Sequence, residues 1–138
     1  HYVYRQSSAL EIGQANTVMA IIKDTFNEKF VSAAFEDYVK ETILDEPKKY
    51  LGFVPSHVGR WWNNREEIDL VAYNERFIAC VECKWQDGKT GYDVLASLQR
   101  KAEGIRRDND QQMMYVLFSK NGFKKSLQDA PCRCFQYL

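Results

Sequence analysis

The 138-residue sequence contains no long apolar run, no net charge and only two histidines. No segment approaches the roughly 20 consecutive apolar residues of a membrane-spanning helix, and no signal-peptide pattern opens the chain. We therefore expect a soluble, cytoplasmic protein without a membrane partner. With only His1 and His57 present, we expect no histidine-based metal site or nucleophile system.

The balance of charge argues against a protein that binds nucleic acid through an overall basic surface. The charge is unevenly distributed, however. Residues 1–82 hold nine Lys or Arg and 13 Asp or Glu, whereas residues 83–138 hold ten and six. The second part could contact a polyanion, but charge alone favours ordinary solvated helix faces.

Four cysteines occur in two closely spaced pairs, Cys80 with Cys83 and Cys132 with Cys134. A zinc knuckle places its two cysteines on a tight turn, so that both sulfur atoms reach one ion. Cys80 and Cys83 lie instead in the apolar run FIACVECKW, a strand candidate, where residues three apart point to opposite faces. We therefore expect free, reduced cysteines and no zinc.

Apolar spacing and turn residues predict a mixed α/β order along the chain. Helical patterns occupy 16–30, 30–44 and 92–106, with a short helix over 123–130. Strand patterns occupy 57–62, 67–73, 77–85, 113–118 and 132–138. Three strands joined by tight turns should be antiparallel, and the following strand–helix–strand should cross over to a parallel neighbour. The pattern predicts a mixed sheet flanked by helices.

The hairpin over 67–85 carries charges where a buried strand should have none. If its turn is centred on Asn74 and Glu75, Asp69 lies opposite Cys80 and diagonal to Glu82. Glu82 and Lys84 are two residues apart, so they share the face of Asp69. A register slip of one residue would place Asp69 among the apolar side chains of the other face.

Two carboxylates converging from adjacent strands repel each other unless a cation lies between them. Mg²⁺ takes one or two carboxylates together with water and phosphate oxygens, and a nearby lysine can stabilise charge developing on phosphorus. The alternative is a salt bridge at the end of the hairpin between Lys84 and the two acids. Spacing alone favours the salt bridge, because D…ExK arises readily by chance.

Asp69, twelve intervening residues and Glu82-Cys83-Lys84 resemble the D-x(n)-(D/E)-x-K signature of the PD-(D/E)XK nuclease superfamily. The predicted elements match its restriction-endonuclease-like α-β-β-β-α-β core. The chain resembles most closely a domain of unknown function found at the C-terminus of archaeal-type P-loop ATPases. The blocks FE, VGRWW, EIDLVA, VECKW and LFSKNGF carry this resemblance, and YRQSSALEIG is similar to the stretch upstream of that domain.

The resemblance implies one nuclease-like domain over 1–138, with a helical extension over 1–29 and a core over 30–138. It implies a Mg²⁺ or Mn²⁺ site held by Asp69, Glu82 and the Cys83 carbonyl. Lys84 would be the catalytic lysine, and Glu36, on the preceding helix, an accessory catalytic carboxylate. The proline that names the superfamily is absent, since Ile68 precedes Asp69.

Two basic residues are candidates for contacts near this site. Arg60 would lie opposite Asp69 if NNRE is a four-residue loop, and it could contact phosphate or pair with Asp69. Lys101 or Gln99, on the helix after the ExK strand, could place a polar group beside the cluster. Trp61 and Trp62 should point to opposite faces of the sheet.

The resemblance also implies an attached N-terminal ATPase, because such proteins carry a P-loop before this domain. No GxxxxGK(S/T) motif occurs in the chain, so we expect no ATP site in it. The chain begins at a histidine in mid-pattern, as a piece of a longer protein would. Two functions are compatible with these residues: a metal-dependent nuclease acting on nucleic acid, or a weakly active or inactive DNA-docking or regulatory module for the ATPase.

Overall fold

The computed structural model describes residues 16–108 and 110–137, and places side chains from Glu28 onward. The chain divides into two units, one ending at Phe35 and the other beginning at Glu36. The stretch YRQSSALEIG and the first half of the predicted extension 1–29 lie outside the described residues. All elements of the sheet belong to the second unit.

One helix, α2 (Asn16–Asp45), occupies the region in which the apolar pattern predicts two. The prediction of a break near Phe30 is wrong, since neither glycine nor proline interrupts residues 16–45. A short helix that the sequence did not predict, α3 (Pro47–Leu51), follows with proline in its first turn. It ends at Gly52, whose φ of 82° lies in the left-handed region.

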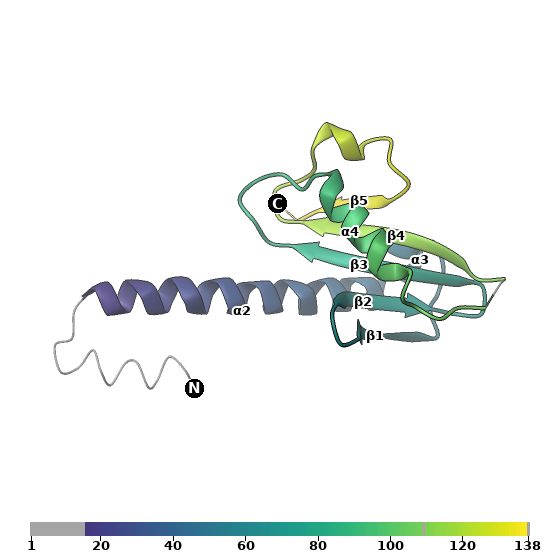
Figure 1. The fold of residues 1–138 in the computed structure, drawn as a ribbon, viewed down its shortest axis with the longest axis horizontal. Coiled ribbons are helices and arrows are strands. Elements are labelled where there is room, and N and C mark those ends of the chain that lie inside the picture. Colours follow the sequence, from purple (N-terminus) through teal and green to yellow (C-terminus); the bar gives the residue numbers. More distant parts are fainter. Residues whose placement is uncertain (1–15, 109, 138) are drawn as a thin grey trace. The chain divides into compact units, whose positions relative to one another are not determined.

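A five-stranded mixed sheet forms the centre of the second unit, which confirms the predicted α/β class (Figure 1). Its strands lie in the order β1 (His57–Trp62), β2 (Glu67–Tyr73), β3 (Phe77–Lys84), β4 (Gln112–Ser119) and β5 (Arg133–Gln136). The first three are antiparallel, and β3, β4 and β5 run parallel. Helix α4 (Tyr92–Ala102) connects β3 to β4.

The register of the β2–β3 hairpin differs from the expected one by two residues. Val71 pairs with Cys80 and Tyr73 with Ile78, so the expected pairing of Asp69 with Cys80 is wrong. The cause is Asn74, whose side-chain oxygen accepts hydrogen bonds from the backbone N–H groups of Arg76 and Phe77. This Asx turn moves the two-residue loop to Glu75 and Arg76. A shift of two residues leaves every side chain on its predicted face.

A β-bulge interrupts the pairing of β1 with β2. Gly59 pairs with Val71, but two residues later Trp61 pairs with Ile68, so β2 contains one extra residue here. The regular pairing of β2 with β3 also stops at Leu70 and Val81. Asp69 therefore lies in the bulged part of β2, beyond the regular ladder, which is where bulges re-aim side chains.

Helix α4 covers one face of the sheet over β2, β3 and β4. Leu95 and Leu98 are fully buried and pack with Cys80, Leu117 and other core residues. On the opposite face, the ring of Tyr50 from α3 lies 5.6 Å from Phe118 and 4.9 Å from Phe135. Both faces are thus covered, as the apolar character of β3 and β4 requires.

Two helix predictions in the second half of the chain are too long. Helix α4 ends at Ala102 rather than near Arg106, and the chain continues through Gly104, which lies against the Trp61 ring. The expected helix over 123–130 is only the 3₁₀ turn η1 (Lys125–Leu127). In both places, short i→i+3 backbone hydrogen bonds replace the α-helical ones.

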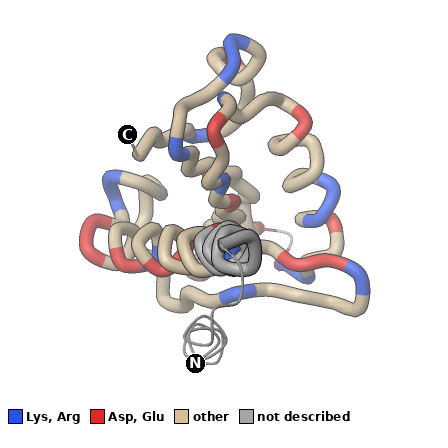
Figure 2. Tube along the Cα trace, turned by 90° about the vertical axis from the view of Figure 1, so that its left-hand side faces the viewer, with Lys and Arg blue, Asp and Glu red and all other residues tan. Residues whose placement is uncertain are grey.

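Along the described part of the trace, basic and acidic residues recur at separate places rather than in one run (Figure 2). Within the described residues, no helix is both long and apolar enough to cross a membrane.

Candidate functional site

Asp69 lies where β2 leaves the regular ladder, beside the last residues of β3. Its Oδ2 atom accepts a hydrogen bond of 2.9 Å from the backbone N–H of Cys83. The bulge in β2 makes this contact possible, because it turns the Asp69 side chain toward the neighbouring strand. Asp69 is thereby held at the end of the hairpin, next to Glu82.

Glu82 is the most deeply buried acidic residue of the site, with 6% of its surface exposed. Its Oε2 atom is buried and has no hydrogen-bond partner among the described residues. The nearest cation is the Nζ atom of Lys101 on α4, at 3.6 Å from Oε2. That distance is too long for a hydrogen bond, so the buried oxygen has an ionic partner but no donor.

Glu36 approaches the same place from α2. Its carboxyl group is close enough to Asp69 for a side-chain hydrogen bond, and the Oε1 atom of Glu36 lies 3.7 Å from the Nη2 atom of Arg60 on β1. Asp69 has a corresponding contact with Glu82. The three carboxyl groups therefore form a chain in which Asp69 is the central member.

This crowding raises the pKa values of the two outer acids. The pKa of Glu82 is raised to about 8 by burial and by the charge of Asp69, against which Lys101 and Lys84 act. The pKa of Glu36 is raised to about 7 by burial and by contact with Asp69, while Arg60 lowers it. The cluster therefore holds protons near neutral pH unless a cation replaces them.

Lys84 is the last residue of β3, two residues after Glu82. Both residues line a small cavity. This cavity, of about 170 Å³, lies between β3 and α4 and is lined by Glu82, Lys84, Asp93, Val94, Ser97 and Lys101. Asp93 and Ser97 are four residues apart on α4 and so share one side of the helix. Neither residue was predicted from the sequence, although their spacing of four residues from each other and from Lys101 was a usable signal.

The structure thus brings Asp69, Glu82 and Glu36 together, with Lys84 at the same end of β3. NNRE does form a four-residue loop, but Arg60 forms its ion pair with Glu36 and not with Asp69. Lys101, rather than Gln99, is the residue of α4 that contacts the acids. Cys83 contributes its backbone N–H to the cluster.

The cysteines are free thiols. Cys80 is fully buried in the core, with its Sγ atom 3.5 Å from Met113 Sδ. The Sγ atoms of Cys132 and Cys134 are 3.4 Å apart. Among the residues from 28 to 137 with described side chains, no three His, Cys, Asp or Glu side chains are already arranged as metal ligands.

Comparison with known proteins identifies a family to which no activity has been assigned. An uncharacterised protein of Methanocaldococcus jannaschii is 30% identical over 139 residues, which cover 97% of this chain. The chain spans only 30% of the length of that relative. No solved structure matches the chain.

The family model that matches covers residues 1–105, from before α2 to just beyond α4, and so includes every residue of the acidic cluster. The chain belongs to DUF234, a family of archaeal and bacterial proteins of unknown function.

Proposed function

We propose that this chain is a divalent-metal-dependent nuclease-like domain of the PD-(D/E)XK type, acting on phosphodiesters of nucleic acid. The observation that carries the proposal is the placement of Asp69 between Glu36 and Glu82, where Glu82 has a buried oxygen without a hydrogen-bond donor. A buried, unsatisfied carboxylate oxygen is costly, and a metal ion bound in place of the cluster's protons would satisfy it.

The residues present fit a Mg²⁺ or Mn²⁺ ion. Mg²⁺ usually takes one or two protein carboxylates and keeps several waters, so Asp69 and Glu82 with the Cys83 carbonyl would suffice to hold it. Three preformed side-chain ligands are not required. Such an ion would lower the pKa of a bound water and polarise the phosphate.

Other residues of the cluster would act on the substrate around this centre. Lys84, beside Glu82, would stabilise negative charge on the phosphate. Glu36, with its pKa raised to about 7, can accept or release a proton near neutral pH. Lys101 and Arg60 hold the outer acids by ion pairs and could contact neighbouring phosphates.

The chain would work as part of a longer protein. It spans 30% of the relative from Methanocaldococcus jannaschii. The remainder would contain the P-loop ATPase that the resemblance implies. The nuclease-like domain would then act on DNA that the ATPase engages.

A cleavage assay tests the proposal. The chain is incubated with single-stranded and duplex DNA and RNA, with Mg²⁺, Mn²⁺ or EDTA. We expect cleavage that requires the ion and falls at least a hundredfold in Lys84→Ala, while Lys89→Ala, an exposed lysine outside the site, keeps it. Nucleic-acid binding without cleavage in any ion would contradict the proposal and indicate a docking module instead.

A further inference from the structure

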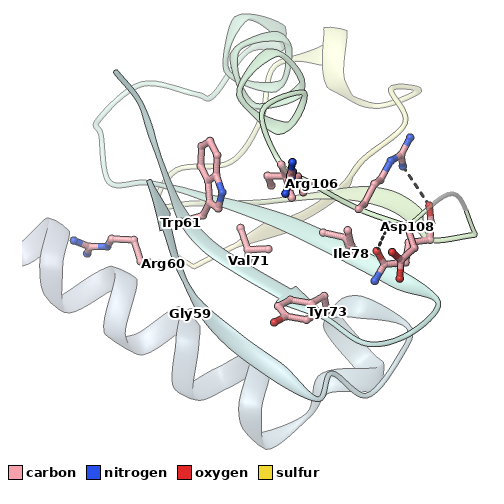
Figure 3. A pocket seen from close by; sticks show the side chains of 11 residues that line it. Gly59, Arg60, Trp61, Val71, Tyr73, Ile78, Arg106 and Asp108 are labelled. Carbon is pink, nitrogen blue, oxygen red and sulfur yellow. Dashed lines mark hydrogen bonds between the residues drawn. The ribbon is translucent and has the colours of Figure 1, made fainter. Parts of the chain in front are cut away.

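A second, larger cavity lies on the face of the sheet that α4 covers only in part. Its volume is about 670 Å³, within the roughly 300–1,000 Å³ typical of ligand pockets. Helix α4 packs across β2, β3 and β4, whereas the cavity opens beside β1. Its floor consists of Val71 and Ile78, and the rings of Trp61 and Tyr73 stand around it (Figure 3).

The cavity exists in part because Gly59 has no side chain. Gly59 pairs with Val71 and therefore shares its face of the sheet. A Cβ atom built on Gly59 would meet no atom within 4 Å, so the space beside it is empty. Glycine weakens a strand interior, and in strands it marks bulges or close approach of a ligand. The bulge accounts for irregular pairing here, but not for the open space.

The loop after α4 forms a polar wall. Gln111 fixes this wall, since its Nε2 atom donates to the carbonyl of Asn74 at 2.8 Å and its Oε1 atom accepts from Asp108 N at 2.9 Å. Arg107 is held by the Gln111 carbonyl at 3.3 Å. Arg106 is exposed, stands beside Trp61 (Figure 3) and forms no ion pair with any residue that the structure describes.

This lining matches a nucleotide. The aromatic rings and the aliphatic floor suit the flat faces of a base, and stacking on aromatic side chains is tolerant of base identity. Arg106 and Arg107 suit a phosphate, and the Asp108 carboxylate can accept hydrogen bonds from amino groups on the base edge. The base must be unpaired to enter, because the edges and faces of a base inside a duplex are covered by its neighbours.

The cavity is also adjacent to the acidic cluster. Arg60 of β1 connects the two, since it is among the residues that line the cavity, while its side chain points away from it (Figure 3) and its guanidinium lies 3.7 Å from Glu36. When one nucleotide of a nucleic-acid strand occupies the cavity, the neighbouring phosphates of that strand would extend toward Asp69 and Glu82. We propose that the cavity binds an unpaired nucleotide and so makes single-stranded regions the substrate class of this site. Only the identification of the ligand as a substrate strand rests on the proposed function.

Binding measurements without divalent metal test the inference. The probes are a fluorescein-labelled oligothymidylate, a blunt duplex of the same length and a free nucleoside monophosphate as competitor. We expect the single strand to bind more tightly than the duplex. Gly59→Leu, which places a side chain in the cavity, should weaken single-strand binding roughly tenfold or more, the loss expected for one stacked base. Gly88→Leu is the matched control, because Gly88 is an exposed loop glycine with equally open surroundings.

A second pair of variants keeps the test decisive if Gly59→Leu fails to fold. Arg106→Ala should weaken single-strand binding and reduce its salt dependence, whereas Arg65→Ala, in the exposed β1–β2 loop, should do neither. Competition by the free monophosphate is the expected result, because the cavity accepts a single nucleotide.

Three results would overturn the inference: equal binding of duplex and single strand, no binding of the single strand, or unchanged binding in both Gly59→Leu and Arg106→Ala. Asp69→Asn separates this outcome from failure of the proposed function. If Asp69→Asn and the parental chain both lack metal-dependent activity but bind the single strand equally, the nuclease proposal fails and the cavity inference stands.

Discussion

The Oδ2 atom of Asp69 accepts a hydrogen bond from the backbone N–H of Cys83 at 2.9 Å, across the gap where β2 and β3 leave their regular ladder. This bond holds the central acid of the cluster beside Glu82, the residue before Cys83. It also means that substitutions of Asp69 change both a charge and a structural contact, and the two effects can be separated.

Asp69→Asn should keep the parental free energy of unfolding at neutral pH, whereas Asp69→Ala should lower it. Asparagine keeps an oxygen for the Cys83 N–H and removes the charge that raises the pKa values of Glu36 and Glu82. Alanine leaves that N–H without its acceptor, at a cost of about 1–3 kcal/mol. Urea unfolding in EDTA measures the difference. Equal stability of the two variants would show that the hydrogen bond contributes nothing.

The stability of the chain without metal should fall as the pH rises through the interval in which Glu82 titrates. Its pKa is raised from 4.5 to about 8, so between these values the folded state binds more protons than the unfolded state. The free energy of unfolding then decreases with increasing pH, by at most about 1.4 kcal/mol per pH unit for one group.

Glu82→Gln removes this titration while keeping the shape of the protonated acid. Its stability relative to the parental chain should therefore increase between pH 5 and pH 8.5, in melting curves recorded in EDTA. Glu75→Gln, in the exposed β2–β3 turn, is the matched control and should follow the parental curve. A parental slope retained in Glu82→Gln would contradict the burial of an uncompensated acid at this position.

Arg60→Ala should raise the pKa of Glu36 above its value of about 7, because the Arg60 guanidinium favours the charged carboxylate. Carbon-detected NMR titration of the Glu36 carboxyl group measures this directly. Arg65→Ala removes a charge from the neighbouring loop and should leave the titration unchanged. A shift of equal size in both variants would mean that general charge, and not the ion pair, sets the pKa.

The sequence predicted the fold well because its signals are local. Two short apolar runs on either side of a turn identified β2 and β3, and the strand–helix–strand order gave the parallel pairing of β3 with β4. The shared face of Glu82 and Lys84 follows from their spacing in one strand. The register was wrong because it depends on which residue begins the turn, and Asn74 does so through side-chain hydrogen bonds that spacing does not reveal.

The rest of the site depends on contacts between distant segments. The ion pairs of Glu36 with Arg60 and of Glu82 with Lys101 join elements whose packing a single sequence does not specify. The larger cavity was missed although Gly59, an isolated glycine in a strand pattern, was a signal for it. The predicted helix over 92–106 also included Ile105 and Arg106, which belong to the loop that forms the other wall.

The melting temperature in Mn²⁺ tests the central claim, a cation site at Asp69 and Glu82, most directly. An ion that binds the folded state stabilises it by about 2.7 kcal/mol at 100 times its dissociation constant, which corresponds to a rise of several degrees. We expect this rise in the parental chain relative to EDTA, its loss in Asp69→Ala and Glu82→Ala, and its retention in Glu75→Ala. No rise in either the parental chain or Arg60→Ala would contradict the account.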